Sequence, residues 1–324
     1  MNIYIDVGST NIKWKYDNDC AHYIPFPLPC VNEGVCFEVR AEEIFRIVQS
    51  LLRGAQRAFL SVQMHGYVLL KNSKEVTNYI SWRDERAKNF APNFTIDKEY
   101  GVDIKPNLPR LSLQTQKVSF DQFCTLGSYL IYRLTGKNET HISDAAPSGF
   151  YNVHHGTREP VPFALPNAQY TVKAVGRYEN TEIYTPVGDQ QASILGAGNH
   201  FDGYILNLGT AGQLCCIENG FCQGEFESRP FFDGKTLCTV TRLLGGEVIA
   251  QYDDREIEER LVKDYKSALK KLPTRNKLLV TGGVVQYRKK LLCRVLDQLS
   301  LPYCFNIGSD ALKGLEIIAK GEVR

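Results

Sequence analysis

The sequence lacks an excess of charge of either sign. Its 38 basic and 36 acidic side chains leave a net charge of +2 over 324 residues. A balance this even does not indicate a nucleic-acid partner, because binding to a phosphate backbone needs a concentrated positive field. With 43% hydrophobic and 23% charged residues, the composition is that of an ordinary globular protein.

Long apolar runs and paired cysteine motifs are also missing. No run approaches the length that spans a bilayer, and residues 1–7 read as a strand rather than a secretion signal. We therefore expect a cytoplasmic protein without a membrane partner. The ten cysteines include the neighbours Cys215 and Cys216 but no CxxC pair. This usage favours buried, reduced thiols over a disulfide framework.

The standard nucleotide-binding motifs are absent. Gly234-Lys235-Thr236 resembles the end of a P-loop, but Arg229 stands where the first glycine of that loop is required. No expected strand is followed by GxGxxG, which argues against a dinucleotide-dependent dehydrogenase.

One short pattern, in contrast, occurs twice. Residues 3–14 and residues 204–214 each form an alternating, β-rich run that is interrupted by a glycine and a hydroxyl residue and then resumes, which predicts two hairpins. Asp6 aligns with Asn207, and Gly8 with Gly209. This recurrence indicates two related domains. We expect them to comprise residues 1–198 and 199–324.

The rest of the chain mixes helical and strand patterns, which predicts an α/β fold. We expect helices at 41–53, 120–134, 254–272 and 311–320, strands at 57–62 and 277–281, and a connecting loop at 156–167. Gly136 is expected to end the second of these helices.

Both hairpin turns have the composition of a phosphate site. Glycine allows the backbone N–H groups to approach a phosphate closely, and a hydroxyl adds a donor. The residues that we expect to bind phosphate are Gly8, Ser9, Thr10, Gly209, Thr210 and Gly212. Lys13 could place a positive charge against a phosphate oxygen, and Asp6 could hold Mg²⁺. One such hairpin alone carries little weight, because most Gly-Ser turns only reverse the chain.

Three further segments carry candidate groups. Asp189 lies between a glycine and an apolar helical run, where it could accept the proton of an alcohol or merely cap the helix. His65 follows a β-rich stretch and could bind a hydroxyl, although a lone histidine is more often structural. Residues 82–86 combine an aromatic ring with charged side chains, which suits a polyol but also a surface salt-bridge cluster.

Taken in order, these segments resemble the FGGY family of carbohydrate kinases. The motifs that carry the resemblance are Asp6-Val7-Gly8-Ser9-Thr10, Gln63-Met64-His65-Gly66, the W-x-D-x-R pattern of Trp82, Asp84 and Arg86, the segment 140–149, Gly188-Asp189-Gln190-Gln191, and Leu208-Gly209-Thr210-Ala211-Gly212. Residues 82–86 and 147–153 most resemble the sedoheptulokinases, with the xylulokinases next. The resemblance implies a duplicated actin-like ATPase (ribonuclease H-like) fold with a cleft between two domains.

The resemblance also implies roles for particular residues. Asp189 would be the catalytic base, and ATP and Mg²⁺ would be bound by the two hairpins. The expected sugar contacts are Met64, His65, Trp82, Asp84, Arg86, Asp144 and Asp189, and the expected adenosine contacts are Gly282, Gly283 and Gly314. The partner is then a small sugar, expected to be a ketose phosphorylated on a primary hydroxyl, and a homodimer is compatible with the sequence.

Two departures from the family pattern bear on this expectation. Only about seventy residues separate Gly212 from Gly282, which indicates a shortened second domain. Val284 stands where a third glycine is expected and would crowd an approaching adenine or ribose. The alternatives are a kinase relative that senses a sugar or nucleotide without turnover, and an actin-like ATPase that acts on no sugar.

Overall fold

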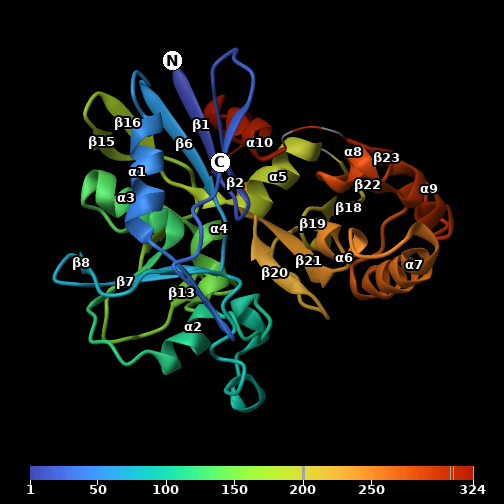
Figure 1. Ribbon diagram of the computed structural model, residues 1–324, viewed down its shortest axis with the longest axis horizontal. Coiled ribbons are helices and arrows are strands. Elements are labelled where there is room, and N and C mark those ends of the chain that lie inside the picture. The colour runs from blue at the N-terminus through green and yellow to red at the C-terminus, as the bar shows by residue number, and fades with distance from the viewer. Residues whose placement is uncertain (199–200, 307, 309, 324) are drawn as a thin grey trace.

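The computed structural model describes residues 1–198, 201–306, 308 and 310–323. Figure 1 shows a larger half that contains the N-terminus and, beside it, a smaller half that runs from the yellow strands β18 and β19 to the red helix α9. The expected domain boundary between residues 198 and 199 lies at the edge of the segment 199–200, which falls outside the described residues.

Three sheets make up most of the strand structure. The first has the order β15-β16-β6-β1-β2-β3, with β17 also paired to β6. Its bounds are β1 Asn2–Val7, β2 Asn11–Tyr16, β3 His22–Pro25, β6 Arg57–Val62, β15 Ala174–Tyr178, β16 Thr181–Tyr184 and β17 Val187–Gly188. The sheet of the smaller half has the order β20-β21-β19-β18-β22-β23. Its bounds are β18 Tyr204–Leu208, β19 Gly212–Asn219, β20 Glu227–Pro230, β21 Lys235–Leu243, β22 Leu278–Thr281 and β23 Tyr303–Phe305.

These two sheets share one topology. In each, a hairpin forms the centre, β1 with β2 and β18 with β19, and its second strand pairs antiparallel with a further strand, β3 or β21. On the other side, the first strand of the hairpin pairs parallel with β6 or β22, which pairs parallel with β16 or β23. The duplication that the sequence predicts from two short hairpins therefore extends over five strands.

The remaining strands belong to the larger half. A second sheet has the order β10-β7-β9-β5-β4, with β8 paired to β7. Its bounds are β4 Val31–Glu33, β5 Cys36–Val39, β7 Tyr67–Lys71, β8 Lys74–Glu75, β9 Tyr79–Ile80 and β10 Gln122–Thr125. Two small pairs join β11 Glu139–His141 to β14 Asn167–Gln169 and β12 Tyr151–Asn152 to β13 Thr157–Arg158.

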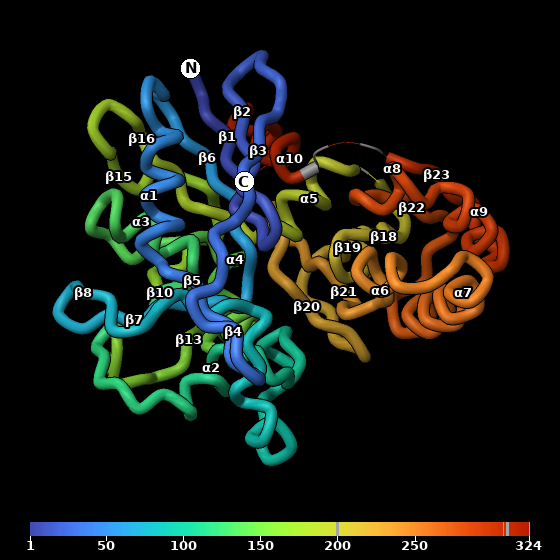
Figure 2. The backbone as a smooth tube through the Cα atoms, viewed as in Figure 1, coloured from blue at the N-terminus to red at the C-terminus, as the bar shows by residue number. Residues whose placement is uncertain are grey.

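The helices cover the faces of these sheets (Figure 2). Their bounds are α1 Ala41–Leu51, α2 Pro109–Ser112, α3 Leu126–Thr135, α4 Ile142–Ala145, α5 Asp189–Gly198, α6 Gly246–Ile249, α7 Asp254–Lys271, α8 Val284–Tyr287, α9 Lys289–Asp297 and α10 Asp310–Ala319. Short 3₁₀ turns occur at Ala91–Asn93, Lys98–Tyr100, Leu113–Thr115, Ala146–Ser148 and Phe232–Gly234.

Most of the elements expected from periodicity are present. Both hairpins form, and the helices at 41–53, 254–272 and 311–320 appear as α1, α7 and α10. The helix expected to begin at residue 120 begins only at Leu126, because Gln122–Thr125 form β10. The Thr125 hydroxyl then caps α3 by accepting a hydrogen bond from the Ser128 N–H, and Gly136 ends this helix in the left-handed region, as expected. The expected loop at 156–167 contains the short strand β13.

Two helices lie between the two large sheets. α5 packs against α10, and one apolar cluster combines their side chains with residues of both sheets. Tyr4 and Phe59 contribute to this cluster from the first sheet, whereas Ile205 and Leu279 contribute from the sheet of the smaller half. Figure 1 accordingly shows α10, the last helix of the chain, beside β1 and β2. The end of the chain thus completes the packing of its beginning.

Two expectations about bulk properties can be compared with the structure. All ten cysteines are free in the structure, but only Cys124, Cys215, Cys216 and Cys238 are buried, so the prediction of buried thiols holds for these four and is wrong for the other six. Within the described part of the chain, none of the helices combines the length and the apolar character that crossing a membrane requires.

The contact between α5 and α10 can be tested at Gly314. A β-carbon added at Gly314 would overlap the backbone carbonyl of Ala192, which cannot move aside as a flexible side chain would. We expect Gly314→Val to lower the free energy of unfolding by about 1–3 kcal/mol, because it overpacks this contact. Denaturation monitored by circular dichroism measures the change. The control is Lys313→Ala at the exposed neighbouring position; equal stability of the two variants would contradict the assigned packing.

Candidate active site

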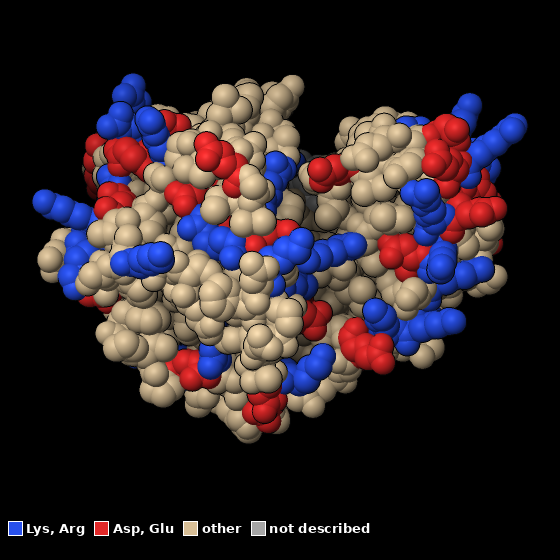
Figure 3. All heavy atoms as spheres, turned by 60° about the horizontal axis from the view of Figure 1, so that its bottom comes forward, with Lys and Arg blue, Asp and Glu red and all other residues tan. Residues whose placement is uncertain are grey.

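A cavity of about 350 Å³ lies between the two hairpins and collects most of the expected site residues. Figure 3 shows the molecule hollowed between its halves, with basic side chains gathered near the middle of this face. The expected residues that line the cavity are Asp6, Gly8, Ser9, Thr10, Lys13, Met64, His65, Trp82, Asp189, Gly209, Thr210, Gly282 and Gly283.

The first hairpin brings an acid and a base to one end of the cavity. Asp6 and Lys13 are direct partners in the antiparallel register of β1 and β2. The Ser61 hydroxyl, on the neighbouring strand β6, donates a 2.8 Å hydrogen bond to Asp6 Oδ1. Burial raises the pKa of Asp6, although the charge of Lys13 and this hydrogen bond oppose the shift. A buried carboxylate beside the cavity has the hard oxygen atoms that Mg²⁺ prefers.

The second hairpin repeats this arrangement without charge. Asn207 and Gln213 are register partners where the first hairpin has Asp6 and Lys13, and Thr281 lies beside Asn207 as Ser61 lies beside Asp6. Amide side chains occupy both positions, so this hairpin can contribute hydrogen bonds but no net charge to a ligand.

Bare backbone faces the cavity at two of the glycines. A β-carbon added at Gly283 would meet no heavy atom within 4 Å, and one added at Gly209 would meet only a carbonyl oxygen 3.8 Å away. Side chains at these positions would project into open space that a ligand can fill. The absence of side chains allows a phosphate or a ribose to approach the backbone closely, so the site fits a magnesium nucleotide.

Asp189 is the first residue of α5 and lines the cavity. In the sequence it lies between the two hairpins. Its Oδ1 atom accepts a 2.8 Å hydrogen bond from the Gln190 N–H. Burial, and then the negative charge of Asp6, raise the pKa of Asp189 to about 7. A carboxyl group with this pKa can take up and release a proton near neutral pH, which the ordinary carboxyl pKa does not allow.

A buried network that the sequence did not predict lies at the other end of the cavity. Arg229, on β20, bonds Glu227 through Nε at 2.7 Å and through NH2 at 2.5 Å, and NH1 donates to the side-chain carbonyl of Gln190. Lys105 donates to the second oxygen of Glu227 and, at 2.6 Å, to the Thr241 hydroxyl. Burial alone would raise the pKa of Glu227, but Arg229 and Lys105 hold it well below the usual range.

The same network fixes the protonation of His65. Arginine only donates, so Nε2 of His65 accepts the 3.1 Å bond from Arg229 NH2. Burial, and then the charge of Arg229, lower the pKa of His65 to about 3, so the ring is neutral at pH 7 with its proton on Nδ1. Nδ1 has no partner among the described residues. His65 also adopts a left-handed backbone with φ of 63°, a strained conformation that is often found at functional sites.

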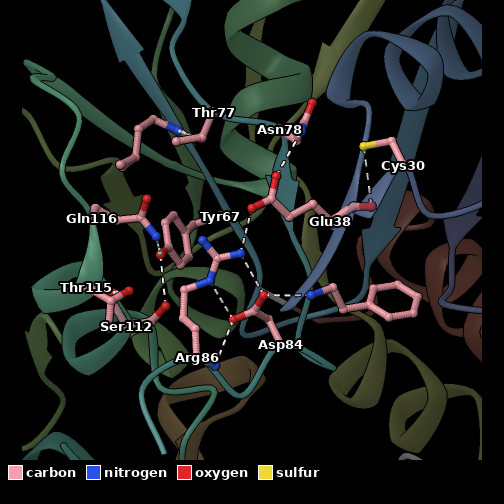
Figure 4. A network of polar contacts seen from close by, with 12 residues as sticks. Cys30, Glu38, Tyr67, Thr77, Asn78, Asp84, Arg86, Ser112, Thr115 and Gln116 are labelled. Atoms are coloured by element: carbon pink, nitrogen blue, oxygen red, sulfur yellow. Dashed lines mark hydrogen bonds and ion pairs between the residues drawn. The ribbon is translucent and has the colours of Figure 1, made fainter. Parts of the chain in front are cut away.

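Asp84 and Arg86, two of the expected sugar contacts, do not line the cavity. Figure 4 shows them paired with each other and with Glu38 of β5. The Arg86 guanidinium reaches both oxygens of Asp84 at 2.7 Å and Glu38 at 2.6 Å, while Asp84 also accepts the Phe37 N–H at 2.7 Å. This buried ion pair ties residues 84–86 to the second sheet, with Trp82 at the cavity.

Three further expected site residues also lie outside the cavity lining. Asp144 is buried, accepts hydrogen bonds from the Thr125 and Thr140 hydroxyls, and has its pKa raised to about 7 by burial. Gly212 is buried at the start of β19, and Gly314 lies at the contact of α10 with α5.

The crowding expected at Val284 does not arise. This side chain is buried in the core of the smaller half, and the neighbouring Gly283 faces open space.

Sequence patterns did not predict most of the residues that complete the cavity. Lys105, Asn107, Arg229, Thr241 and Arg242 all line it, but they lie on a loop and two adjacent strands without a recognisable motif. Gln190 is the exception, because it follows Asp189 directly. Only the pairing of β20 with β21 brings the later residues together.

Comparisons with known proteins bear on the fold. No protein-family model matches the sequence, and no curated protein matches it. Among solved structures, a ligand-bound xylulose kinase from Lactobacillus acidophilus is similar, with a TM-score of 0.83 and 18% identity over 99% of this chain and 89% of the other. A gluconate kinase from the same organism gives 0.82 and 17% over the same shares. A glycerol kinase from Plasmodium falciparum with ADP gives 0.72 and 12%, over 99% and 90%.

At these identities the likeness establishes the fold. Together with the duplicated five-strand topology, it shows that the chain has the actin-like ATPase fold predicted from the sequence.

The role of Arg86 yields a prediction. Removing one partner of a buried ion pair leaves an uncompensated charge, so we expect Arg86→Met to lower the free energy of unfolding by about 3–5 kcal/mol. Urea denaturation measures this loss. The exposed Arg83, which stacks on Trp82, provides the matched control Arg83→Met. A stable Arg86→Met protein with only weakened ligand binding would instead make Arg86 a ligand contact.

Proposed function

We propose that the protein is an ATP-dependent carbohydrate kinase that transfers the γ-phosphate to a primary hydroxyl of a sugar. The observation that supports this most is the position of Asp189, with its pKa near 7, in the same cavity as two glycine hairpins of matching topology. Phosphoryl transfer to an alcohol needs a base for the hydroxyl proton and donors for the phosphate oxygens.

In this proposal the two hairpins have different tasks. Backbone N–H groups at Gly8 to Thr10 and at Gly209 and Thr210 hold phosphate oxygens, and Lys13 adds a positive charge. Asp6 would hold Mg²⁺ directly or through water, and a bound ion would supply positive charge against the phosphate oxygens. Gly282 and Gly283 lie beside the adenosine. The second hairpin, which has amides in place of Asp6 and Lys13, acts through hydrogen bonds alone.

The acceptor lies at the other end of the cavity. Trp82 offers an apolar ring face to the carbon chain, the Nδ1–H of His65 donates to a hydroxyl, and Asp189 takes the proton of the attacking hydroxyl. Positioning this hydroxyl in line with the γ-phosphate supplies much of the rate. We propose a ketose, similar to sedoheptulose or xylulose, as the acceptor. The similar structures are kinases named for xylulose, gluconate and glycerol, so the fold leaves the acceptor open.

We further propose that residues 1–198 and 199–324 act as two domains that close over the substrates and exclude water. The closeness to sedoheptulokinases and the shortening of the second domain remain predictions. The competing function is that of a kinase relative that binds sugar or nucleotide without turnover. Sugar-dependent release of ADP separates the two functions.

The role of Asp189 is tested by Asp189→Asn, which keeps the shape of the side chain and removes the base. We expect sugar-dependent ADP release to fall at least 100-fold, since a general base contributes roughly 10²–10⁴-fold. A coupled assay with saturating ATP measures the rate, and Asp202→Asn, at an exposed position outside the cavity, is the matched control. Activity of Asp189→Asn within about threefold of the wild-type rate would rule out this assignment.

The pH dependence follows from the same group. Because the pKa of Asp189 is raised to about 7, the carboxylate is protonated, and therefore inactive as a base, below that pH. We expect kcat/KM for the sugar to rise about tenfold per pH unit below pH 7 and to level off above it. A rate measured from pH 5.5 to 8.5 that stays flat would show that proton uptake by this group does not limit the reaction.

A further inference from the structure

We propose that the acceptor is a sugar acid, whose carboxylate binds against Arg242 and Lys105 in the part of the cavity that these two side chains and Arg229 line. This inference rests on the proposed kinase function and changes its acceptor from a neutral ketose to a ketose chain that carries a carboxylate, as a keto-sugar acid does.

The charges at this end of the cavity are not balanced. Three cationic side chains, Lys105, Arg229 and Arg242, line it, and Glu227 is the acid with which two of them pair. Lys105 and Arg229 are largely buried, with side-chain exposures of 13% and 3%. One carboxylate shared by two nearly buried cations leaves a positive charge that is costly without a further anion.

Asp189 does not remove this imbalance during the reaction. Its carboxylate lowers the positive field while it is ionised, but it becomes neutral when it takes the proton of the attacking hydroxyl. His65 is neutral as well, because its pKa is lowered to about 3. A carboxylate on the acceptor would supply the missing charge throughout the reaction.

The hydrogen-bonding capacity of the cations points to the place of that carboxylate. Arg229 uses four of its five N–H donors in contacts with Glu227, Gln190 and His65. Arg242 makes one hydrogen bond within the described part of the chain, from NH2 to Asn107 Oδ1 at 3.1 Å. Lys105 has used two of its three hydrogens. Among these three cations, the free donors therefore belong chiefly to Arg242, with one more on each of Lys105 and Arg229.

The geometry of Arg242 is also unusual for a surface arginine. Its backbone is left-handed, with φ of 60°, and the side chain is anchored at Asn107, which in turn donates to the Trp82 carbonyl at 2.6 Å. This arrangement links the guanidinium, through Asn107, to the backbone of Trp82, which also lines the cavity. A planar guanidinium with free parallel donors matches a planar carboxylate, which it can bind through two hydrogen bonds.

The test compares acceptors of equal carbon number. Pentonic, hexonic and heptonic acids and their keto derivatives are assayed for ADP release beside the matching neutral ketoses, alditols and sugar phosphates. We expect kcat/KM to be at least tenfold higher for an acid than for its neutral counterpart. In Arg242→Gln the value for the acid should fall about 10- to 100-fold, as for loss of hydrogen bonds to a charged group, with the neutral acceptors within about threefold.

The matched control is Arg260→Gln, an exposed arginine of α7 outside the cavity, which should leave the preference unchanged. Equal or better turnover of neutral sugars, or a preference for sugar phosphates, would overturn the proposal while leaving the kinase function intact. If no acceptor stimulates ADP release, the kinase function fails. Calorimetry with the same acids and alditols then still tests the anion site, because Arg242→Gln must selectively weaken binding of the acids.

Discussion

The close contact of α5 with α10 positions the groups that face the cavity. Asp189 is the first residue of α5, which lies between the first sheet and the sheet of the smaller half. Each of these sheets contributes one hairpin turn to the cavity. Because Gly314 allows the backbones of the two helices to approach closely, a single apolar cluster joins the helices to both sheets. This packing, together with the polar contacts of Lys105, Arg229 and Arg242 between the halves, defines the room for a nucleotide between the hairpins.

Polar groups instead distribute charge along the cavity. One end has Asp6 opposite Lys13 and a second hairpin with amides at the same positions, which suits a metal ion and a polyanion. The other end has a chain of contacts from Lys105 through Glu227 and Arg229 to Gln190 and His65, which joins segments of both halves. Asp189 lies between these regions and responds to both, since Asp6 raises its pKa and Arg229 lowers it.

The sequence predicted those parts of the molecule that depend on local pattern. The hairpins, the position of Asp189 and the glycines at 209 and 283 follow from residue types at short spacing. Of the five duplicated strands, the sequence reveals only the two that form each hairpin. The outer strands β3 and β21, and β16 and β23, share no motif that would reveal the repeat. The W-x-D-x-R pattern shows where prediction from local pattern fails. Its three residues lie within five positions of one another, yet Trp82 lines the cavity while Asp84 pairs with Arg86, which in turn bonds Glu38. The pairing of β5 with β9 brings Glu38 to this ion pair.

The place of α10 has a consequence for how the chain folds during synthesis. The helix leaves the ribosome after β1, β6 and α5, on which it packs. Until α10 has been synthesised, the face of the first sheet that carries Tyr4 and Phe59 lacks its cover, and the nascent first half exposes these two side chains. Formation of this half therefore waits for the smaller half to be made, and the two halves become native together rather than one after the other.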